Sequence, residues 1–163
     1  MNSISAIKEL IEQHLGISIS MDEPRGQLTL GVDELVPVCD LLWRNPATYF
    51  DSLSCLTAID NGLEAGTLEI IYTLYSIPNH LTCHLRLELP RLDSAGALPE
   101  VPTISHIWKT ADWHEREAYD LVGVKFKDHP DLRRILLPED WKGHPLRKDY
   151  DDPDTYHGVK VKY

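Results

Sequence analysis

The stretch of sequence that decides the fold is Trp113–Gly123, which reads WHEREAYDLVG. Asp112 precedes it and Glu115 follows three residues later, which is the spacing of a capping box at a helix start. Gly123 suits the left-handed residue that commonly follows a helix end. These residues predict a short helix that Asp112 caps and Gly123 terminates.

The expected helix has an apolar face and a charged face. At about 100° per residue, the apolar face holds Trp113, Ala118, Leu121 and Val122, and the opposite face holds Glu115, Arg116, Tyr119 and Asp120. Glu117 falls within the apolar arc, where a carboxylate is unfavourable unless cations or donors meet it. We therefore expect Arg133 and Arg134 to fold back onto Glu117.

Composition narrows the function. A chain of 163 residues with 42% hydrophobic and 26% charged residues is typical of one globular domain. The formal net charge of -10 argues against binding to nucleic acid or anionic lipid, because both require clustered cations. Proteins are the expected partners. No apolar run approaches the roughly 18 residues of a membrane span, and we expect no leader peptide.

The three cysteines predict neither a disulfide framework nor a metal centre. Cys39, Cys55 and Cys83 are widely spaced and form no CxxC motif. We expect them to be reduced, buried thiols. His80 and His84 would lie ~13 Å apart on a strand, which is too far to chelate one ion.

The N-terminal third predicts two helices separated by a hairpin. Apolar residues at helical spacing span residues 4–15, with Ser3 or Ser5 as a possible cap and Gly16 at the end. Residues 17–21 and 27–30 alternate in polarity and predict a hairpin. A second helix is expected between a cap at Asp33 and Asn45, because Pro46 disfavours helix at the residue before it.

Three strands are expected next, at residues 53–59, 67–75 and 81–89. The third alternates without exception, so one face of the sheet packs on the core and the other is solvated or covered by a partner. After a connector at 93–102, Thr103 can cap a short turn over 104–108. This order predicts an α+β domain, in which an antiparallel sheet carries helices on one side.

The pattern changes after Pro138. Residues 138–163 lose periodicity, yet they contain aromatic residues and arginine of the kind enriched at interfaces: Trp141, Arg147, Tyr150, Tyr156 and Tyr163. A disordered tail is the alternative, and we favour an extended arm that becomes ordered on a neighbouring subunit. The expected organisation is a domain at 1–137 and an extended C-terminal arm at 138–163.

Three ordered motifs lie along the chain. They are Glu115-Arg116-Glu117, Asp120-Leu121-Val122, His129 and Arg133-x-Ile135-Leu136 in the centre, Leu56-Thr57-Ala58-Ile59-Asp60 upstream, and Gly143-His144-Pro145-Leu146-Arg147-Lys148-Asp149-Tyr150 downstream. Together they resemble the signature of the family of the 30 kDa, or C-like, subunit of respiratory complex I, the NADH-quinone oxidoreductase. Asp128 stands where the family has glycine; aspartate tolerates a positive φ better than most residues, so only a local change is expected.

The resemblance implies a peripheral-arm subunit with no catalytic residue, flavin, iron-sulfur cluster or metal of its own. The implied partners are the quinone-site subunit, which is D-like, and iron-sulfur subunits, which are B- and I-like, on the cytoplasmic side of the inner membrane. It implies that Glu115, Arg116, Glu117 and the Arg133-Arg134 pair lock helix to loop and form part of a surface that partners read. NADH, ferredoxin or a reduced deazaflavin all remain possible electron donors.

Two other functions are weighed against this one. A free-standing acid-base enzyme would use His114, Glu115 and Glu117, although no nucleophile or cofactor motif accompanies them. A zinc site of the HExxH type fails because Ala118 stands where the second histidine is required. His144 either contacts the backbone of a partner or lies solvated in a loop.

Overall fold

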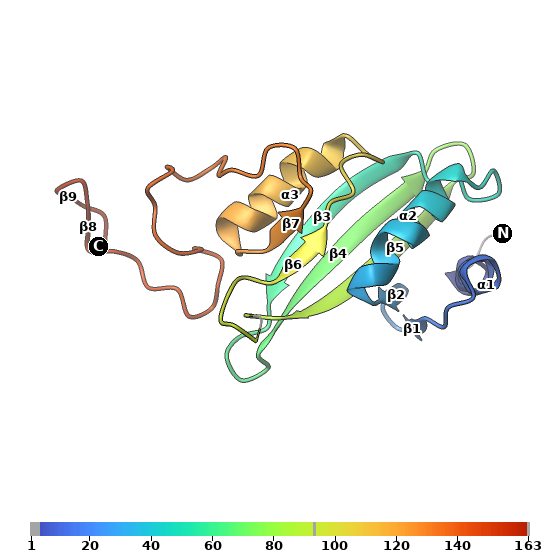
Figure 1. The fold of residues 1–163 in the computed structure, drawn as a ribbon, viewed down its shortest axis with the longest axis horizontal. Helices are drawn as coiled ribbons and strands as arrows, with labels where there is room; N and C mark the ends of the chain where they lie inside the picture. The colour runs from blue at the N-terminus through green and yellow to red at the C-terminus, as the bar shows by residue number, and fades with distance from the viewer. Residues whose placement is uncertain (1–3, 93, 163) are drawn as a thin grey trace.

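The computed structural model describes residues 4–92 and 94–162, and its fold class is α+β (Figure 1). The elements in order are α1 (Ile4–Leu15), β1 (Ser20–Asp22), β2 (Gln27–Leu30), the 3-10 helix η1 (Val32–Glu34), α2 (Leu35–Arg44), β3 (Ser52–Asp60), β4 (Thr67–Ser76), β5 (Leu81–Pro90), β6 (Glu100–Pro102), α3 (Thr110–Leu121), β7 (Lys125–Lys127), β8 (Thr155–Tyr156) and β9 (Val159–Lys160).

The main sheet has five strands in the order β1-β2-β5-β4-β3. It is antiparallel as expected except that β2 and β5 run parallel. A parallel neighbour needs a long crossover, and here α2 and the β3–β4 hairpin lie between the two strands in sequence. The short β6 and β7 form a separate parallel pair.

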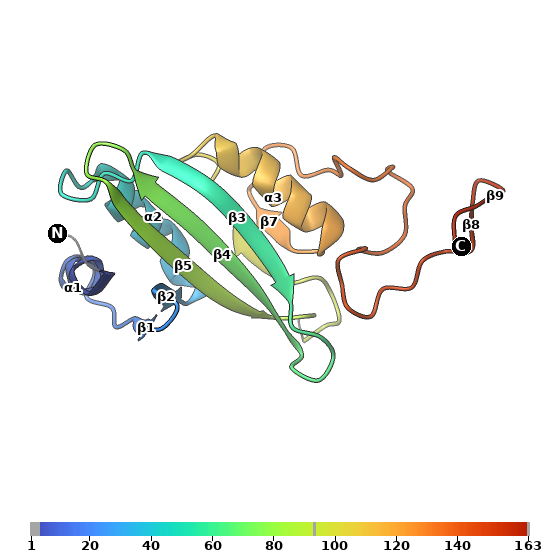
Figure 2. The same ribbon diagram turned by 180° about the vertical axis from the view of Figure 1, so that it is seen from behind.

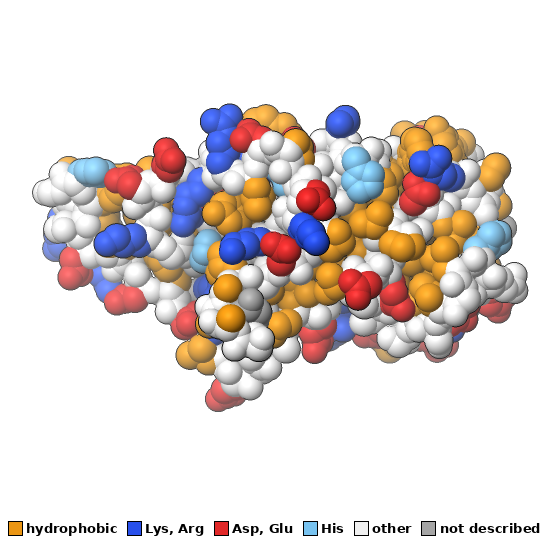
Figure 3. Space-filling model, in the orientation of Figure 1, with side chains coloured by type: hydrophobic (Ala, Val, Ile, Leu, Met, Phe, Trp, Pro, Cys, Tyr) orange, Lys and Arg blue, Asp and Glu red, His pale blue; other side chains and the backbone are white. Residues whose placement is uncertain are grey.

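α2 and α3 lie over one face of the sheet, α1 lies beside its β1–β2 edge, and the other face is left open (Figures 1 and 2). The alternation of β5 is confirmed: Leu81, Cys83, Leu85, Leu87 and Leu89 are all buried. Hydrophobic side chains also reach the surface of the helical face, interspersed with charges of both signs (Figure 3). None of the helices in the described ranges is long and apolar enough to cross a membrane.

The N-terminal elements follow the predicted pattern, but the predicted cap of α2 is wrong. Gly16 ends α1 with a φ of +66°, and the β1–β2 hairpin forms as expected. Ser3 lies outside the described residues. Asp33 lies inside η1, and the Glu34 carboxylate accepts a hydrogen bond from the Gly31 N–H at 2.7 Å. The 3-10 turn therefore replaces a side-chain cap, and α2 ends before Asn45 as predicted.

The helix α3 differs from the prediction in where it begins and in which side chains it buries. It begins at Thr110, so Asp112 lies in its first turn and is not its cap. Trp113 is 63% exposed, and the Arg116 guanidinium lies 5.0 Å from its ring centre. Glu117 is exposed and does not face the core. Ala118 and Val122 are buried as predicted, so only Trp113 departs from the predicted apolar face. Glu115 and Asp120 are buried as well, because coil segments cover the polar side of α3.

The end of α3 and two local conformations match the predictions. Gly123 follows the helix with a φ of +79°, and its N–H donates to the carbonyls of Ala118 and Tyr119. Asp128 has a φ of +62°, which confirms that aspartate adopts the left-handed conformation there. Of the three cysteines, all free, Cys39 and Cys83 are buried, whereas Cys55 is partly exposed, contrary to prediction.

The C-terminal region has two parts. Residues 143–149 return to the body and bind it through hydrogen bonds, whereas the β8–β9 hairpin extends beyond the body (Figure 1). We call residues 151–162 the distal arm. The predicted boundary at 137/138 stays a prediction.

Candidate functional site

The Asp120 carboxylate is fully buried at the C-terminal end of α3. Its Oδ2 accepts hydrogen bonds from the backbone N–H groups of Ile135, Leu136 and Leu137, at 3.0, 2.8 and 3.0 Å. Its Oδ1 pairs with Arg134 Nη1 at 2.7 Å. Four donors thus satisfy one buried carboxylate and fasten the loop 134–137 to the helix.

Arg134 connects this carboxylate to the next segment. Its Nη2 donates to the carbonyl oxygens of Trp141, at 3.1 Å, and Gly143, at 2.9 Å. Burial alone would raise the pKa of Asp120, but the N–H donors and the Arg134 guanidinium outweigh burial and lower that pKa. The carboxylate therefore stays ionised.

The C-terminal end of α3 is closed by His144 and Arg147. The Nδ1 of His144 donates to the Asp120 carbonyl at 3.0 Å. Arg147 donates to the carbonyls of Val122, at 2.7 Å, and Gly123, at 3.2 Å. A cation beside the last carbonyls of a helix is favourable for both hydrogen bonding and the helix dipole. Burial lowers the pKa of His144, with Arg147 and Arg134 adding to this effect.

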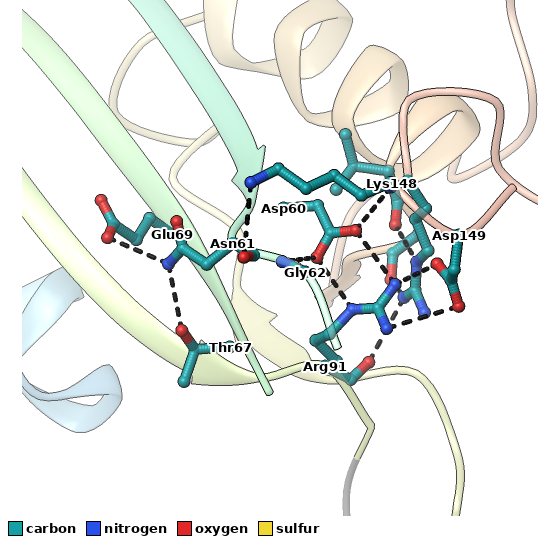
Figure 4. A network of polar contacts seen from close by, with 11 residues as sticks. Asp60, Asn61, Gly62, Thr67, Glu69, Arg91, Lys148 and Asp149 are labelled. Carbon is teal, nitrogen blue, oxygen red and sulfur yellow. Dashed lines mark hydrogen bonds and ion pairs between the residues drawn. The ribbon is translucent and has the colours of Figure 1, made fainter. Parts of the chain in front are cut away.

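A second buried carboxylate, Asp60 at the end of β3, joins three parts of the chain (Figure 4). It pairs with Arg91 Nε at 2.8 Å and accepts from the backbone N–H of Lys148 at 2.8 Å and of Gly62 at 3.0 Å. Arg91 also pairs with Asp149. Burial opposes ionisation of Asp60, but these donors outweigh it and lower its pKa.

Glu115 forms the third buried cluster, under the loop that follows β6. It is fully buried and accepts hydrogen bonds from the Thr103 hydroxyl and from the Ile104 N–H at 2.8 Å. Its Oε2 lies 3.7 Å from His129 Nε2. Burial raises the pKa of Glu115 to about 7, although the two donors oppose this shift.

His129 is held in place by two backbone groups. Its Nε2 donates to the Asp112 carbonyl at 3.1 Å, and its Nδ1 accepts from the Asp131 N–H at 3.0 Å. A carbonyl only accepts and an N–H only donates, so one proton on Nε2 satisfies both contacts. His129 therefore ties the loop after β7 to the first turn of α3.

The remaining signature residues each make fewer contacts. Arg116 donates to the Arg133 carbonyl at 3.2 Å, and Arg133 pairs with exposed Asp131 at 3.0 Å. Tyr150 accepts from Trp141 Nε1 at 2.9 Å. The expectation that Arg133 and Arg134 pair with Glu117 is wrong. Arg134 pairs with Asp120, and the Arg133 side chain is exposed to solvent.

The structure also separates the proposed acid-base residues. Glu115 points into the core, whereas His114 and Glu117 line a groove between α3 and β3. They therefore do not share one reaction site. Among the described residues, no group of three or more histidine, cysteine, aspartate or glutamate side chains could hold a metal ion.

Sequence reasoning missed two of the partners that complete these clusters. Arg91 directly follows the end of β5 and belongs to none of the sequence motifs. Thr103 was expected to cap a turn, and it does accept from the Ser105 N–H at 3.1 Å, but it also donates to Glu115. The signal available for Asp60 was its place at the end of the strand motif.

The comparisons with known proteins agree with each other. The family model described as respiratory-chain NADH dehydrogenase, 30 Kd subunit, matches residues 28–156. The C-like NADH-quinone oxidoreductase subunit of Geobacter sulfurreducens is 38% identical over 160 residues, which cover 94% of both chains. That of Chloroherpeton thalassium is 45% identical over 132 residues, which cover 81% of this chain and only 52% of the relative. This chain thus matches about half the length of the latter protein.

A solved structure has the same fold. A chain in the membrane-bound sulfane sulfur reductase, an archaeal respiratory membrane complex, superposes with a TM-score of 0.70. The match covers 90% of this chain and 84% of that chain at 21% identity.

Proposed function

Because the chain belongs to the family of the 30 Kd subunit of respiratory-chain NADH dehydrogenase, we propose that it is a structural and interaction subunit of an NADH-quinone or ferredoxin-quinone oxidoreductase. Within the peripheral arm it binds no flavin, iron-sulfur cluster or quinone of its own. Partner subunits hold these groups, carry electrons from the donor to quinone and couple the transfer to proton translocation.

The proposal rests on one observation, which is that the buried charges bond to the backbone of their own chain. Asp120, Arg134 and Asp60 each bond several backbone groups of their own chain. Buried charges in such arrangements are costly to disturb and contribute to one defined conformation. This supports a role in shaping a surface for partners.

The proposed position follows from the family. The chain packs beside the D-like quinone-site subunit and the B- and I-like iron-sulfur subunits, as a peripheral protein on the cytoplasmic side of the inner membrane. The distal arm supports partner binding, since it presents Val159, which is 65% exposed, together with Val161 and the aromatic Tyr156.

The test is affinity purification of the tagged full chain from native membranes in mild detergent, followed by mass spectrometry. Recovery with iron-sulfur and membrane subunits is expected, and their identities distinguish NADH from ferredoxin as donor. Recovery of the chain alone from the soluble fraction contradicts the proposal.

A second measurement separates this role from an acid-base enzyme. In a complex carrying Glu117→Gln, quinone reduction per assembled complex should equal that of the unmodified complex, because Glu117 takes no part in chemistry. Abolished turnover in a fully assembled complex favours the enzyme instead.

A further inference from the structure

The outer edge of the main sheet at β3 is unpaired. β3 bonds to β4 on one side, and no strand in the described ranges lies on its other side (Figure 2). It has nine residues, whereas β1 at the opposite edge has three. β3 is therefore the longer of the two free edges and the better template for another strand.

This edge has only part of the usual protection against pairing. Free edge strands commonly carry charges, prolines or bulges that prevent association. β3 has one bulge between Leu53 and Cys55, but it has no charged residue and no proline before Asp60. Ile59 is 38% exposed. A long edge without charges or proline is consistent with a strand that is covered in the assembly.

The register identifies the backbone groups that point outward. The Asn61 N–H donates to the Thr67 carbonyl at 3.1 Å, which continues the β3–β4 ladder. Bonded and non-bonded pairs alternate in an antiparallel ladder, so Leu56 and Ala58 direct their N–H and C=O groups away from β4. These groups are positioned to bond an added strand.

A groove runs along this edge, between β3 and α3. Four consecutive residues, Cys55 to Ala58, line it, and because their side chains alternate between faces, the groove follows the edge itself. The α3 wall consists of His114, Glu117, Ala118 and Leu121, at helical i, i+3, i+4 and i+7 spacing, and Val122 and Leu146 complete the lining. Its volume is about 230 Å³.

One charge on the α3 wall lacks a counterion. Glu117 is exposed, and within residues 4–92 and 94–162 its carboxylate forms no hydrogen bond or ion pair. By contrast, the buried carboxylates Glu115 and Asp120 on the same helix are fully bonded. An incoming segment with one Lys or Arg would meet Glu117 beside an apolar floor.

We propose that an extended segment of a partner protein adds to β3 as a further strand and fills this groove. Its backbone bonds Leu56 and Ala58, its apolar side chains contact Leu121 and Leu146, and a Lys or Arg pairs with Glu117. Strand addition between a free edge and a helix is a general mode of peptide recognition. The surface is separate from the distal arm.

A second copy of this chain is the less favourable occupant. β3 contains no Lys or Arg that could meet Glu117. Each copy also carries a formal net charge of -10, so edge-to-edge pairing brings like charges together.

The native Cys55 thiol reports on the groove. In the isolated chain N-ethylmaleimide should label Cys55, while buried Cys39 and Cys83 serve as internal controls. In the complex purified from membranes, labelling of Cys55 should be at least about tenfold slower, because an added strand covers it. Equal rates in the two preparations overturn the proposal, even where co-purification upholds the proposed function.

A cross-link identifies the occupant. The isolated tagged chain, with Cys55 carrying a maleimide benzophenone, is reassembled with membranes depleted of the native chain and irradiated. Mass spectrometry should find an adduct to an apolar partner segment that contains Lys or Arg. Adducts to a second copy of this chain, or the absence of an adduct to any other protein of the complex, contradict the proposal.

Two variants test the recognition directly. Glu117→Lys should lower recovery of the complex about tenfold, since it places a cation against the partner's cation. Glu9→Lys, on the exposed side of α1, makes the same change of charge and should leave recovery unaltered. Equal losses in both variants would mean that only net charge matters, and the proposal would fail.

Ala58→Pro tests the backbone contact. It removes the outward N–H while sparing the bonds to β4, and proline is tolerated at strand edges. Recovery should fall as in Glu117→Lys while circular dichroism stays unchanged; normal recovery of the folded variant overturns strand addition. If Ala58→Pro does not fold, the labelling and charge-reversal results decide.

Discussion

At the scale of single residues, two adjacent arginines differ in what they hold. Arg134 has a side chain 16% exposed and pairs with fully buried Asp120, whereas the Arg133 side chain is 73% exposed. The sequence pattern identified Arg133 and Arg134 as one basic pair, but it did not predict which of the two side chains is buried. The difference arises from the path of the chain after Asp131, which turns one side chain inward.

We expect Arg134→Met to lower the free energy of unfolding by roughly 3 kcal/mol, because it leaves the buried Asp120 carboxylate without its cation. The control Arg133→Met should cost less than ~1 kcal/mol, as is usual for an exposed ion pair. Urea unfolding followed by circular dichroism measures both. Similar losses in the two variants would show that the Arg134–Asp120 pair is not the stronger contact.

Glu115 should make stability depend on pH. Its folded pKa of about 7 lies above the unfolded value of about 4.3, so the folded state binds the proton more tightly. The stabilisation is complete below the unfolded pKa and is lost as pH rises to about 7. Asp112 lies close to the same carboxyl group, and its negative charge adds to the rise in the pKa of Glu115.

The variant Glu115→Gln isolates that effect. Between pH 5 and 7 the unmodified chain should lose stability relative to Glu115→Gln, by an amount on the order of 2 kcal/mol. Urea midpoints at a series of pH values give the difference. Parallel pH profiles for the two chains would rule out a raised pKa for Glu115.

At the scale of elements, strands were easier to predict than the orientation of α3. The side chains of β5 alternate between a buried face and an open face of the sheet, so the two-residue period of its sequence was enough to predict which ones are buried. α3 is covered on its apolar side by the sheet and on its polar side by loops, so Glu115 and Asp120 are buried with their partners. Hydrophobic periodicity assumes one solvated face, and that assumption fails where coil covers a helix.

Gly123 is required by the contact between the end of α3 and His144. Its φ is +79°, and an added Cβ would lie 2.5 Å from the His144 ring. Gly66 also has a positive φ, +66°, but an added Cβ there would meet nothing within 4 Å. Both alanine variants should therefore incur the backbone strain of roughly 1–2 kcal/mol, and only Gly123→Ala should incur a clash as well.

We expect Gly123→Ala to be less stable than Gly66→Ala by about 1–3 kcal/mol, the usual cost of overpacking. Thermal and urea unfolding of the two variants provide the comparison. Adding His144→Ala to Gly123→Ala should recover part of the clash, although the hydrogen bond to Asp120 is lost. Equal stabilities of the two alanine variants would show that His144 moves away freely.

At the scale of the whole molecule, the sequence indicated that the C-terminal region differs in composition from the rest of the chain. It did not show where this region contacts the body. Arg147 and the Lys148 N–H bind the ends of α3 and β3. Those contacts join residues far apart in the chain, so local composition carries no sign of them. Some of the aromatic residues that distinguish this region contact each other within it. The ring centroids of Trp141 and Tyr156, for example, lie 5.0 Å apart.

Two truncations should separate folding from assembly. Ending the chain after Tyr150 removes the distal arm, whose hydrogen bonds join it to Asp140 and to its own residues. The free energy of unfolding should then change by less than about 0.5 kcal/mol, as for surface changes elsewhere, while recovery with the complex falls. Ending it after Lys142 also removes Arg147, Lys148 and Asp149.

The longer truncation should lower the free energy of unfolding by roughly 3 kcal/mol or more, because Asp60 and Arg91 lose partners while they stay buried. Urea unfolding and membrane co-purification, run on both truncated chains, separate the two effects. If the shorter truncation unfolds the body, the distal arm belongs to the folding unit. If it leaves recovery of the complex unchanged, partners bind elsewhere, and the β3 edge becomes the principal surface to map.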